Sequence, residues 1–238
     1  MKKHMKRLAA PRTWQIKRKE AKWTAKPKPG PHKVGASIPL MLAVRDYLKY
    51  AGSSGEAKKI IREGNVVVDK KVRKDFKFPL GLMDIVEIPK TRERYLVLFD
   101  KMGKLILKKI SKASSKYKLC KIVNKTVVRG GNIQLNLHDG RNFLLSVKKD
   151  IYKTKDTLLL DVEKNSIKKH LHFKAGNLAL ITGGRHRAEV ARIKEINTTR
   201  TPEPNTVTLS NNSRTFSSVE DYVFVIGEKK PEISEVSK

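Results

Sequence analysis

The side chains in this sequence best suited to chemistry are cations set among two tryptophans near its start. Of its 238 residues, 53 are Lys or Arg and 23 are Asp or Glu, so the formal net charge is +30. Residues 1–33 hold twelve cations and one acid, hence a local charge of +11. Cations bind phosphates and indoles stack on bases. The candidate RNA-binding residues here are Lys2, Lys3, Lys6, Arg7, Arg12, Trp14, Lys17, Arg18, Lys19, Lys22, Trp23, Lys26, Lys28, His32 and Lys33.

Groups that would support catalysis or bind a metal are few and scattered. Cys120 is the single cysteine, and its alternation with Leu119 and Ile122 is typical of a buried strand. His170 and His172 could share one strand face, but no third ligand stands beside them in the sequence. The spacings of phosphate-binding and dinucleotide-binding loops do not occur. We therefore expect no enzyme activity, no cofactor, no metal site and no small-molecule substrate.

The remaining composition predicts a folded cytoplasmic protein. Leu, Ile, Val and Phe make up about 27 % of the chain, above the roughly 20 % below which a highly charged chain is expected to be disordered. No run of 18 apolar residues could span a membrane, and the basic start lacks the apolar core of a secretory signal. A single cysteine fits a reducing compartment.

The elements that would position the cations form an α+β fold of several domains. Composition and turn signals divide the chain into a basic N-terminal arm that orders on nucleic acid, a two-helix domain with a β-ribbon, a central antiparallel β domain, a further β-rich unit and a flexible tail. Their expected bounds are 1–37, 38–90, 91–170, 171–227 and 228–238. A resemblance described below implies that the further β-rich unit is an SH3-like small β-barrel.

Two helices and a ribbon are predicted in the second segment. Apolar residues at helical spacing indicate a helix over 40–51 that ends at Gly52. Ser53 and Glu56 fit a capping box for a second helix, and Gly64 suits its C-terminal cap. A strand at 66–68, a turn at 69–71 and a closing strand at 83–88 follow. The candidate RNA-binding cations are Arg45, Lys49, Lys58, Lys59, Arg62, Lys70, Lys71, Arg73 and Lys74.

This arrangement resembles the alpha-L RNA-binding motif, which ribosomal proteins, pseudouridine synthases and some tRNA synthetases share. The resemblance is carried by Ala57, Gly64, Asn65, Val66, Val68, Asp69, Val72 and Asp84. It implies that the second helix and the adjoining loop grip folded RNA through its backbone. Without the motif around them, the lysines of the helix would equally fit a solvated face.

Short β-rich runs separated by turn signals predict the central domain. The runs lie at 95–99, 105–107, 118–123, 133–137, 143–147 and 157–162. Asp139-Gly140 between two of them is a hairpin signal. A small antiparallel sheet or barrel accounts for the pattern without any chemistry.

The next segment resembles the KOW motif of ribosomal and transcription-elongation proteins. A strand at 178–181, a Gly-containing basic loop and a strand at 189–196 carry the resemblance, although an ordinary β-hairpin gives a similar pattern. Runs at 207–209 and 222–226 would complete the barrel. Ala188 stands where the motif usually has glycine, and a positive φ there would cost roughly 1 kcal/mol. The loop residues that could contact RNA or a protein partner are Arg185, His186 and Arg187.

The order of these parts resembles the archaeal and eukaryotic small-subunit ribosomal protein S-four-e family over residues 2–227. Matching strings include Lys6-Arg-Leu-Ala-Ala-Pro11, Gly30-Pro-His-Lys33, Pro79-Leu-Gly-Leu-Met-Asp84 and Phe224-Val-Ile-Gly227. Departures are Lys70, where many members have a turn glycine, and Ala188. The resemblance implies a structural protein of cytoplasmic ribosomes that binds small-subunit rRNA and neighbouring ribosomal proteins. The short C-terminal tail favours an archaeal member.

Two alternatives belong to other classes. A KOW-containing transcription or translation regulator would bind RNA as a free protein rather than as part of a ribosomal subunit. An RNA-modifying enzyme with an alpha-L module would need a catalytic domain with a suitable carboxylate, and the central segment shows no such site.

Overall fold

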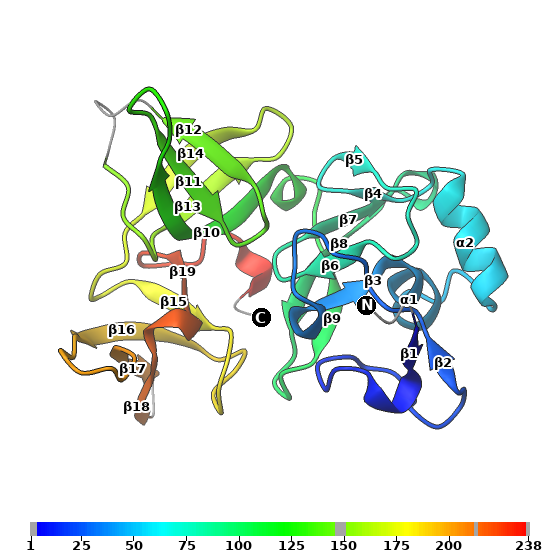
Figure 1. Ribbon diagram of the computed structural model, residues 1–238, viewed down its shortest axis with the longest axis horizontal. Helices are drawn as coiled ribbons and strands as arrows, with labels where there is room; N and C mark the ends of the chain where they lie inside the picture. Colours follow the sequence, from blue (N-terminus) through cyan, green and yellow to red (C-terminus); the bar gives the residue numbers. More distant parts are fainter. Residues whose placement is uncertain (1–3, 146–150, 212–213, 237–238) are drawn as a thin grey trace. The chain divides into compact units, whose positions relative to one another are not determined.

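Antiparallel β-strands are the main regular elements of the computed structural model, which describes residues 4–145, 151–211 and 214–236. Helices are few and short, so the fold is mostly β. The chain divides into two compact units, drawn in Figure 1. The first comprises Met1–Asp100 and Lys104–Lys118, and the second comprises Lys101–Gly103 and Leu119–Lys238. Among the described residues, no helix has the length and hydropathy that a membrane crossing requires.

The first unit is built around a five-stranded sheet with the order β5-β4-β7-β8-β9. Two pairs of short strands, β1 with β2 and β3 with β6, lie outside this sheet. The elements of the unit are β1 (Met5–Lys6), β2 (Trp23–Thr24), β3 (Ser37–Pro39), α1 (Leu40–Leu42) with a π-helical continuation (Ala43–Tyr47), α2 (Ser54–Arg62), β4 (Val67–Val68), β5 (Lys71–Val72), β6 (Pro79–Gly81), β7 (Ile85–Ile88), β8 (Glu93–Phe99) and β9 (Leu105–Lys109).

Helix α2 forms as the sequence predicts. The Ser53 side chain accepts a hydrogen bond from the Glu56 amide, and the Glu56 carboxylate accepts one from Ser53, so the capping box is complete. Ala57 and Ile61 are buried on one face, and Gly64 follows the helix at φ +81°. The predicted capping box and C-terminal glycine are therefore confirmed.

The first helix is shorter than predicted. Its π-helical part ends at Tyr47, and Lys49 has a φ of +57°, so the chain leaves the helix before Gly52. The predicted strand at 83–88 is also shorter: Met83 has a φ of +66°, and β7 begins at Ile85. Apolar spacing gave no sign of these two left-handed residues, because neither is a glycine.

The N-terminal segment, which the sequence predicts to be a basic arm that orders on nucleic acid, packs on the rest of the first unit. Trp14 is 2 % exposed, and its indole Nε1 donates to the Ser37 carbonyl at 2.6 Å. The Leu105 amide of β9 donates to the Thr13 carbonyl at 2.8 Å. A buried aromatic ring and a strand-like hydrogen bond therefore anchor this segment to the first unit.

A buried ionic cluster connects distant parts of the first unit. The Nζ atom of Lys118 lies 2.6 Å from a carboxylate oxygen of Asp69 and 2.6 Å from one of Asp84. The other Asp84 oxygen is 3.0 Å from His32 Nε2 and accepts the Gly81 amide at 2.8 Å. Burial alone would raise the pKa of Asp84, but Lys118 and then His32 outweigh it and hold this pKa well below its usual range.

The second unit contains two five-stranded sheets with the orders β12-β11-β10-β13-β14 and β18-β17-β16-β15-β19. The pairs β10–β11, β11–β12 and β13–β14 of the first sheet and all four pairs of the second are antiparallel. The first sheet packs over Leu135, Leu158 and Leu160. The strands are β10 (Tyr117–Val127), β11 (Ile133–Leu137), β12 (Asn142–Leu145), β13 (Thr157–Asp161), β14 (Ser166–Leu171), β15 (Leu178–Ile181), β16 (Val190–Asn197), β17 (Thr206–Asn211), β18 (Arg214–Val219) and β19 (Val223–Gly227).

Several strands of this unit match their predicted bounds. β11 and β15 coincide with the predicted runs, and the Asp139-Gly140 hairpin joins β11 to β12 with Gly140 at φ +75°. The end of the run at 143–147 falls outside the described residues. β14 and β18 were not predicted, because charged and hydroxyl side chains dominate them.

The C-terminal segment, expected as a flexible tail over 228–238, packs on the rest of the second unit as far as the structure describes it. Ile233 and Val236 are 3 % and 8 % exposed. The Glu232 amide donates to the Ile226 carbonyl at 3.0 Å, and Lys169 Nζ lies 2.7 Å from the Glu232 carboxylate. Two apolar side chains among many charges are only a weak sequence signal of packing. Their burial is nevertheless enough to hold the segment in place. The last two residues lie outside the described part.

Replacing Lys118 by Met should lower the free energy of unfolding by about 3–5 kcal/mol at pH 7, because two buried carboxylates lose their partner. Urea denaturation measures this, with the exposed Lys116→Met as a matched control expected within about 0.5 kcal/mol of wild type. Because the folded-state pKa of Asp84 is depressed, its stabilising contribution is present above about pH 4 and is lost as pH falls further. The deficit of the Lys118 variant should therefore shrink in acid, and an acid-independent deficit would contradict this account.

Candidate nucleic-acid interface

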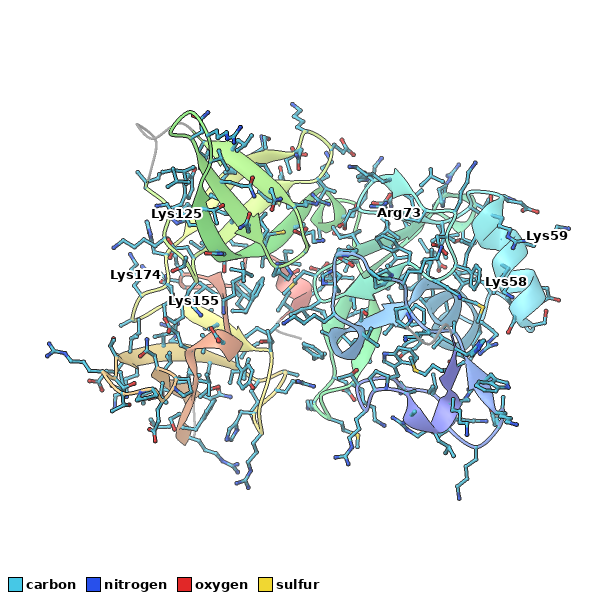
Figure 2. The ribbon with its side chains drawn as sticks, in the orientation of Figure 1. Lys58, Lys59, Arg73, Lys125, Lys155 and Lys174 are labelled. Atoms are coloured by element: carbon cyan, nitrogen blue, oxygen red, sulfur yellow. The ribbon has the colours of Figure 1, made fainter. Side chains whose placement is uncertain are left out.

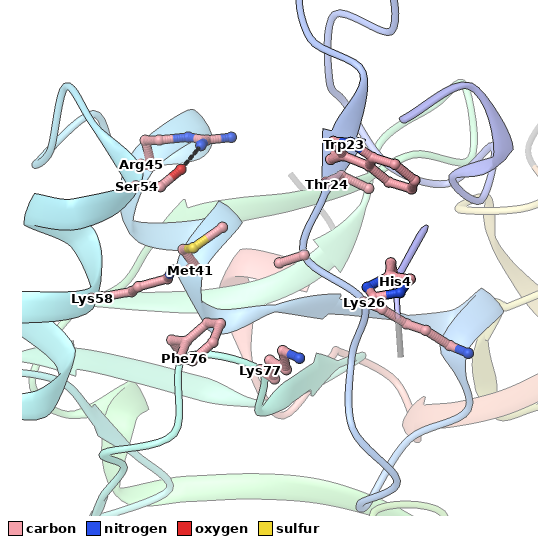
Figure 3. Close-up of a pocket in the computed structure, with 11 residues that line it drawn as sticks. His4, Trp23, Thr24, Lys26, Met41, Arg45, Ser54, Lys58, Phe76 and Lys77 are labelled. Carbon is pink, nitrogen blue, oxygen red and sulfur yellow. Dashed lines mark hydrogen bonds between the residues drawn. The ribbon is translucent and has the colours of Figure 1, made fainter. Parts of the chain in front are cut away.

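An open pocket of the first unit brings cations and aromatic rings together (Figure 3). Its volume is about 610 Å³, and it lies between β2 on one side and α2 with the π-helical stretch on the other. The eleven residues that line it include no acid; they are His4, Trp23, Thr24, Ala25, Lys26, Met41, Arg45, Ser54, Lys58, Phe76 and Lys77. The pocket therefore presents positive charge beside apolar ring surface.

Aromatic rings in the pocket are positioned by neighbouring cations. The Lys58 and Lys77 ammonium groups lie 5.0 and 5.6 Å from the centre of the Phe76 ring. Lys22 is 5.7 Å from the centre of the Trp23 indole, which is 52 % exposed. Exposed rings flanked by ammonium groups can stack on a base while the cations hold its phosphate.

Helix α2 and the ribbon after it extend the basic surface (Figure 2). Because Ala57 and Ile61 face the core, the helix directs Lys58, Lys59 and Arg62 outward, with Lys58 half-buried and the other two exposed. Lys71 and Lys74 of the ribbon are exposed as well. Arg73 lies over the Phe78 ring at 4.4 Å.

The ribbon turn is formed by two residues that are not glycine. Asp69 and Lys70 have φ values of +49° and +62° between the paired residues Val68 and Lys71. Both central residues are left-handed, as in the type I′ turn that matches strand twist. Lys70, where a turn glycine is frequent in the resembling family, adopts the conformation that glycine provides there and pairs with Glu87 at 2.9 Å.

Fourteen of the predicted RNA-binding residues are exposed in the described part of the chain. Two of them already contact a carboxylate: Lys17 is 2.8 Å from Glu20, and Lys28 is 2.6 Å from Asp75. Burial would raise the pKa of Asp75, but the hydrogen bonds from Lys28 and from the Lys77 amide, together with the charges of these two lysines, outweigh burial and lower this pKa. The exposed set is Lys6, Arg12, Lys17, Lys19, Lys22, Trp23, Lys28, Lys33, Lys49, Lys59, Arg62, Lys71 and Lys74 in the first unit, to which the second unit adds Arg185.

Several predicted RNA-binding residues are buried or half-buried and contact other groups of the first unit. Trp14 and Arg7 are buried, the latter 4 % exposed with Nε donating to the Lys17 carbonyl at 2.5 Å. Arg18 donates to three carbonyls of the N-terminal segment at 2.7–3.1 Å. Arg45 pairs with its neighbour Asp46 at 2.8 Å, and His32 belongs to the buried ionic cluster. Guanidinium groups have five donors, so they satisfy loop carbonyls well, and this use of arginine is invisible in composition.

The remaining predicted residues have mixed positions. Lys26 is half-buried at the pocket, while Lys2 and Lys3 lie outside the described residues. Sequence reasoning missed His4, Phe76 and Lys77 at the pocket. The alternating run Lys74-Asp-Phe-Lys-Phe78 was a usable signal for the last two, since it sets cations beside aromatic rings.

The loop between β15 and β16 in the second unit exposes one strong cation. Gly184 and Ala188 have φ values of +77° and +71°, so Ala188 does adopt the strained conformation considered from the sequence. Arg187 Nε donates to the Thr182 carbonyl at 2.8 Å, and His186 stacks on Phe216 with ring centres 4.2 Å apart. Arg185 is exposed and is the loop's best candidate for an external contact.

Family models match most of the chain in three successive parts. The model described as "RS4NT (NUC023) domain" matches residues 1–34, the "S4 domain" matches 44–86, and "Ribosomal family S4e" matches 91–167. The S4 match includes α2 and the ribbon, and the first match includes Trp23 of the pocket.

Relatives of known identity match over nearly the full length. "Small ribosomal subunit protein eS4" of Methanococcus maripaludis is 50 % identical over 98 % of this chain and 97 % of the relative. The protein of the same name from Methanocaldococcus jannaschii is 50 % identical over 97 % and 96 %. A crystal structure of the 30S ribosomal protein S4e from Thermoplasma acidophilum matches with a TM-score of 0.70 at 33 % identity, covering 81 % of this chain and 96 % of that one. This chain therefore belongs to the ribosomal family S4e.

Proposed function

We propose that this protein is a structural constituent of the small ribosomal subunit that binds and organises small-subunit rRNA during translation in the cytoplasm. One observation carries the proposal beyond family membership: the pocket between β2 and α2 has exposed Trp23, a Phe76 ring flanked by lysines, and no acid in its lining. Such a surface suits folded RNA, and the archaeal relatives fit an archaeal ribosome.

Recognition would rest on charge and shape rather than on sequence. The major groove of A-form RNA is too narrow for side chains to read, so Lys59, Arg62 and the ribbon lysines would contact phosphates and release bound counterions. The pocket would receive a base that is not paired, stacked on Trp23 or Phe76. Catalysis has no part in this role.

Different parts of the chain would have different roles in binding. We assign residues 38–90 to an alpha-L module and residues 171–227 to a KOW-like barrel, with 91–170 as a β domain between them. Arg185, at the tip of the loop between β15 and β16, would give the barrel a contact with RNA or with a neighbouring small-subunit protein. The five-stranded antiparallel order of β15 to β19 and the left-handed loop residues support this assignment.

Fractionation of salt-washed ribosomes tests the proposed function directly. A structural constituent should remain with small subunits at one copy per particle through washes that remove loosely bound factors. Quantitative mass spectrometry of the gradient fractions gives that ratio. Recovery mainly at the top of the gradient would instead favour the free KOW-containing regulator.

Neutralising the outward face of α2 should weaken RNA binding and reduce its salt dependence. In the triple variant Lys58→Gln, Lys59→Gln, Arg62→Gln, three phosphate contacts are lost. The slope of log K against log salt should therefore fall in magnitude by roughly 2–3. Filter binding or fluorescence anisotropy with transcribed small-subunit rRNA over a salt series measures both quantities.

A matched control removes the same charge from another surface. Lys164, Lys168 and Lys229 are exposed in the second unit, and their triple change to Gln alters the net charge equally. The control should reduce affinity less and leave the slope closer to wild type. Equal effects of the two triple variants would mean that total charge, not the α2 face, determines binding.

The two tryptophans should separate stability from RNA binding. Trp14→Ala should cost about 3–5 kcal/mol of folding stability because a buried ring leaves a cavity. Trp23→Ala should change stability by no more than about 0.5 kcal/mol, yet weaken rRNA binding by about 1–3 kcal/mol through lost stacking. Thermal denaturation and anisotropy on both variants check this, and the pocket assignment fails if Trp23→Ala binds rRNA like the wild type.

A further inference from the structure

Two histidines and a buried aspartate meet at one end of the β13–β14 pair. His170 Nε2 lies 2.6 Å from Asp156 Oδ2, and His172 Nδ1 lies 3.6 Å from the same oxygen. One ligand atom from each of the three residues lies within 4.8 Å of the other two. The imidazole rings are 4.1 Å apart between centres. The cluster lies wholly within the second unit.

Strand register explains why these residues share a face. Thr157 pairs with Leu171 and Leu158 with His170, so Asp156 comes opposite His172 just beyond the ladder. Side chains alternate along a strand, and directly opposed residues of an antiparallel pair point the same way. Fourteen positions in sequence separate Asp156 from His170. The third ligand missing from the sequence is therefore supplied by pairing across the sheet.

We propose that Asp156, His170 and His172 bind a divalent transition metal, with Zn²⁺ as the best fit. Two imidazole nitrogens and one carboxylate oxygen are a ligand set that zinc accepts in tetrahedral geometry. With metal–ligand bonds of about 2.0–2.1 Å, neighbouring ligand atoms lie about 3.3 Å apart. The present separations from Asp156 Oδ2, 2.6 and 3.6 Å, lie on either side of that value. His172 is half exposed, which leaves a fourth position for water.

The surroundings hold the ligands in place as an outer shell does at metal sites. The second Asp156 oxygen, Oδ1, accepts the Phe173 amide at 2.7 Å, and Oδ2 accepts the Lys153 amide at 3.1 Å. The Tyr152 ring packs against His170 with centres 4.8 Å apart. Outer-shell partners of this kind orient ligands and contribute to affinity. A bound metal would fasten the segment before β13 to the end of β14.

A second cluster, Cys120 with His138 and Asp139, is a weaker candidate. The Asp139 carboxylate accepts from Cys120 Sγ at 3.4 Å and lies 3.2 Å from Arg141. The His138 Nδ1 accepts the Lys121 amide at 3.2 Å, and its ring packs on Phe224. Cys120 and Asp139 are buried, His138 is half-buried, and the carboxylate already has the thiol and a guanidinium as partners. The Asp156 cluster has neither an arginine contact nor full burial.

The test is titration of the full chain with Zn²⁺ by isothermal calorimetry and with Co²⁺ by visible absorption. Wild type should bind one Zn²⁺ per chain, give the intense Co²⁺ bands of four-coordinate geometry, and melt at a higher temperature with Zn²⁺ because the ion binds only the folded site. His172→Gln should lower the affinity by roughly tenfold or more, since even outer-shell partners are worth about 10–100-fold.

A matched variant distinguishes this site from chance binding by a histidine beside a carboxylate. His186 lies 3.1 Å from Glu189 with no third ligand among the described clusters, so His186→Gln should leave the Zn²⁺ affinity unchanged. Because His172 is half exposed, its replacement should keep the wild-type melting temperature of the metal-free protein. Absence of saturable Zn²⁺ binding, or equal losses in the two variants, would overturn the proposal and leave the cluster a hydrogen-bonded one.

Discussion

Lys118 is the point on which the first unit depends, because groups from three distant segments meet around its ammonium group. Asp69 comes from the ribbon turn, Asp84 from the turn before β7, and His32 from the N-terminal segment by way of Asp84. A side chain at position 81 would be excluded, since its Cβ would lie 2.2 Å from the His32 ring. Gly81 therefore permits the close approach that lets one buried cation fix two turns and the first residues of the chain relative to each other.

Buried carboxylates also shape the surface charge. Asp84, Asp139 and Asp156 are buried, and each is satisfied by cations, imidazoles or amides within its own unit. Acids used in this way compensate interior groups, and much of the net charge of +30 is left to exposed side chains. Among the described residues, Lys121 is a buried cation without a carboxylate hydrogen bond: its Nζ donates to the backbone carbonyls of Asp221 and Val223. Its burial, and to a smaller extent the nearby charge of Lys155, lower its pKa to about 8. Interior lysines keep their charge best beside carboxylates.

Local signals in the sequence were sufficient for elements whose stability is local. The α2 capping box and the Asp139-Gly140 hairpin are determined by residues within a few positions of each other, and both were predicted. Left-handed Lys49 and Met83 were missed, because tertiary contacts there override the preference for glycine. The metal-binding potential of Asp156 was missed for a related reason: the pairing register that brings it to the histidines is a non-local property.

The two tryptophans show where pattern alone could not separate a buried aromatic residue from an exposed one. Both lie in strongly basic sequence, yet the Trp14 indole donates to Ser37, 23 positions away, whereas Trp23 is half exposed on the two-residue strand β2. The segment thus has an inner face that completes the first unit and an outer face that lines the pocket. An RNA that pulled it away would have to expose Trp14 and break the Thr13–Leu105 hydrogen bond. Binding to the segment in its folded position avoids that cost, so under the proposed function the N-terminal cations would act as a preformed surface.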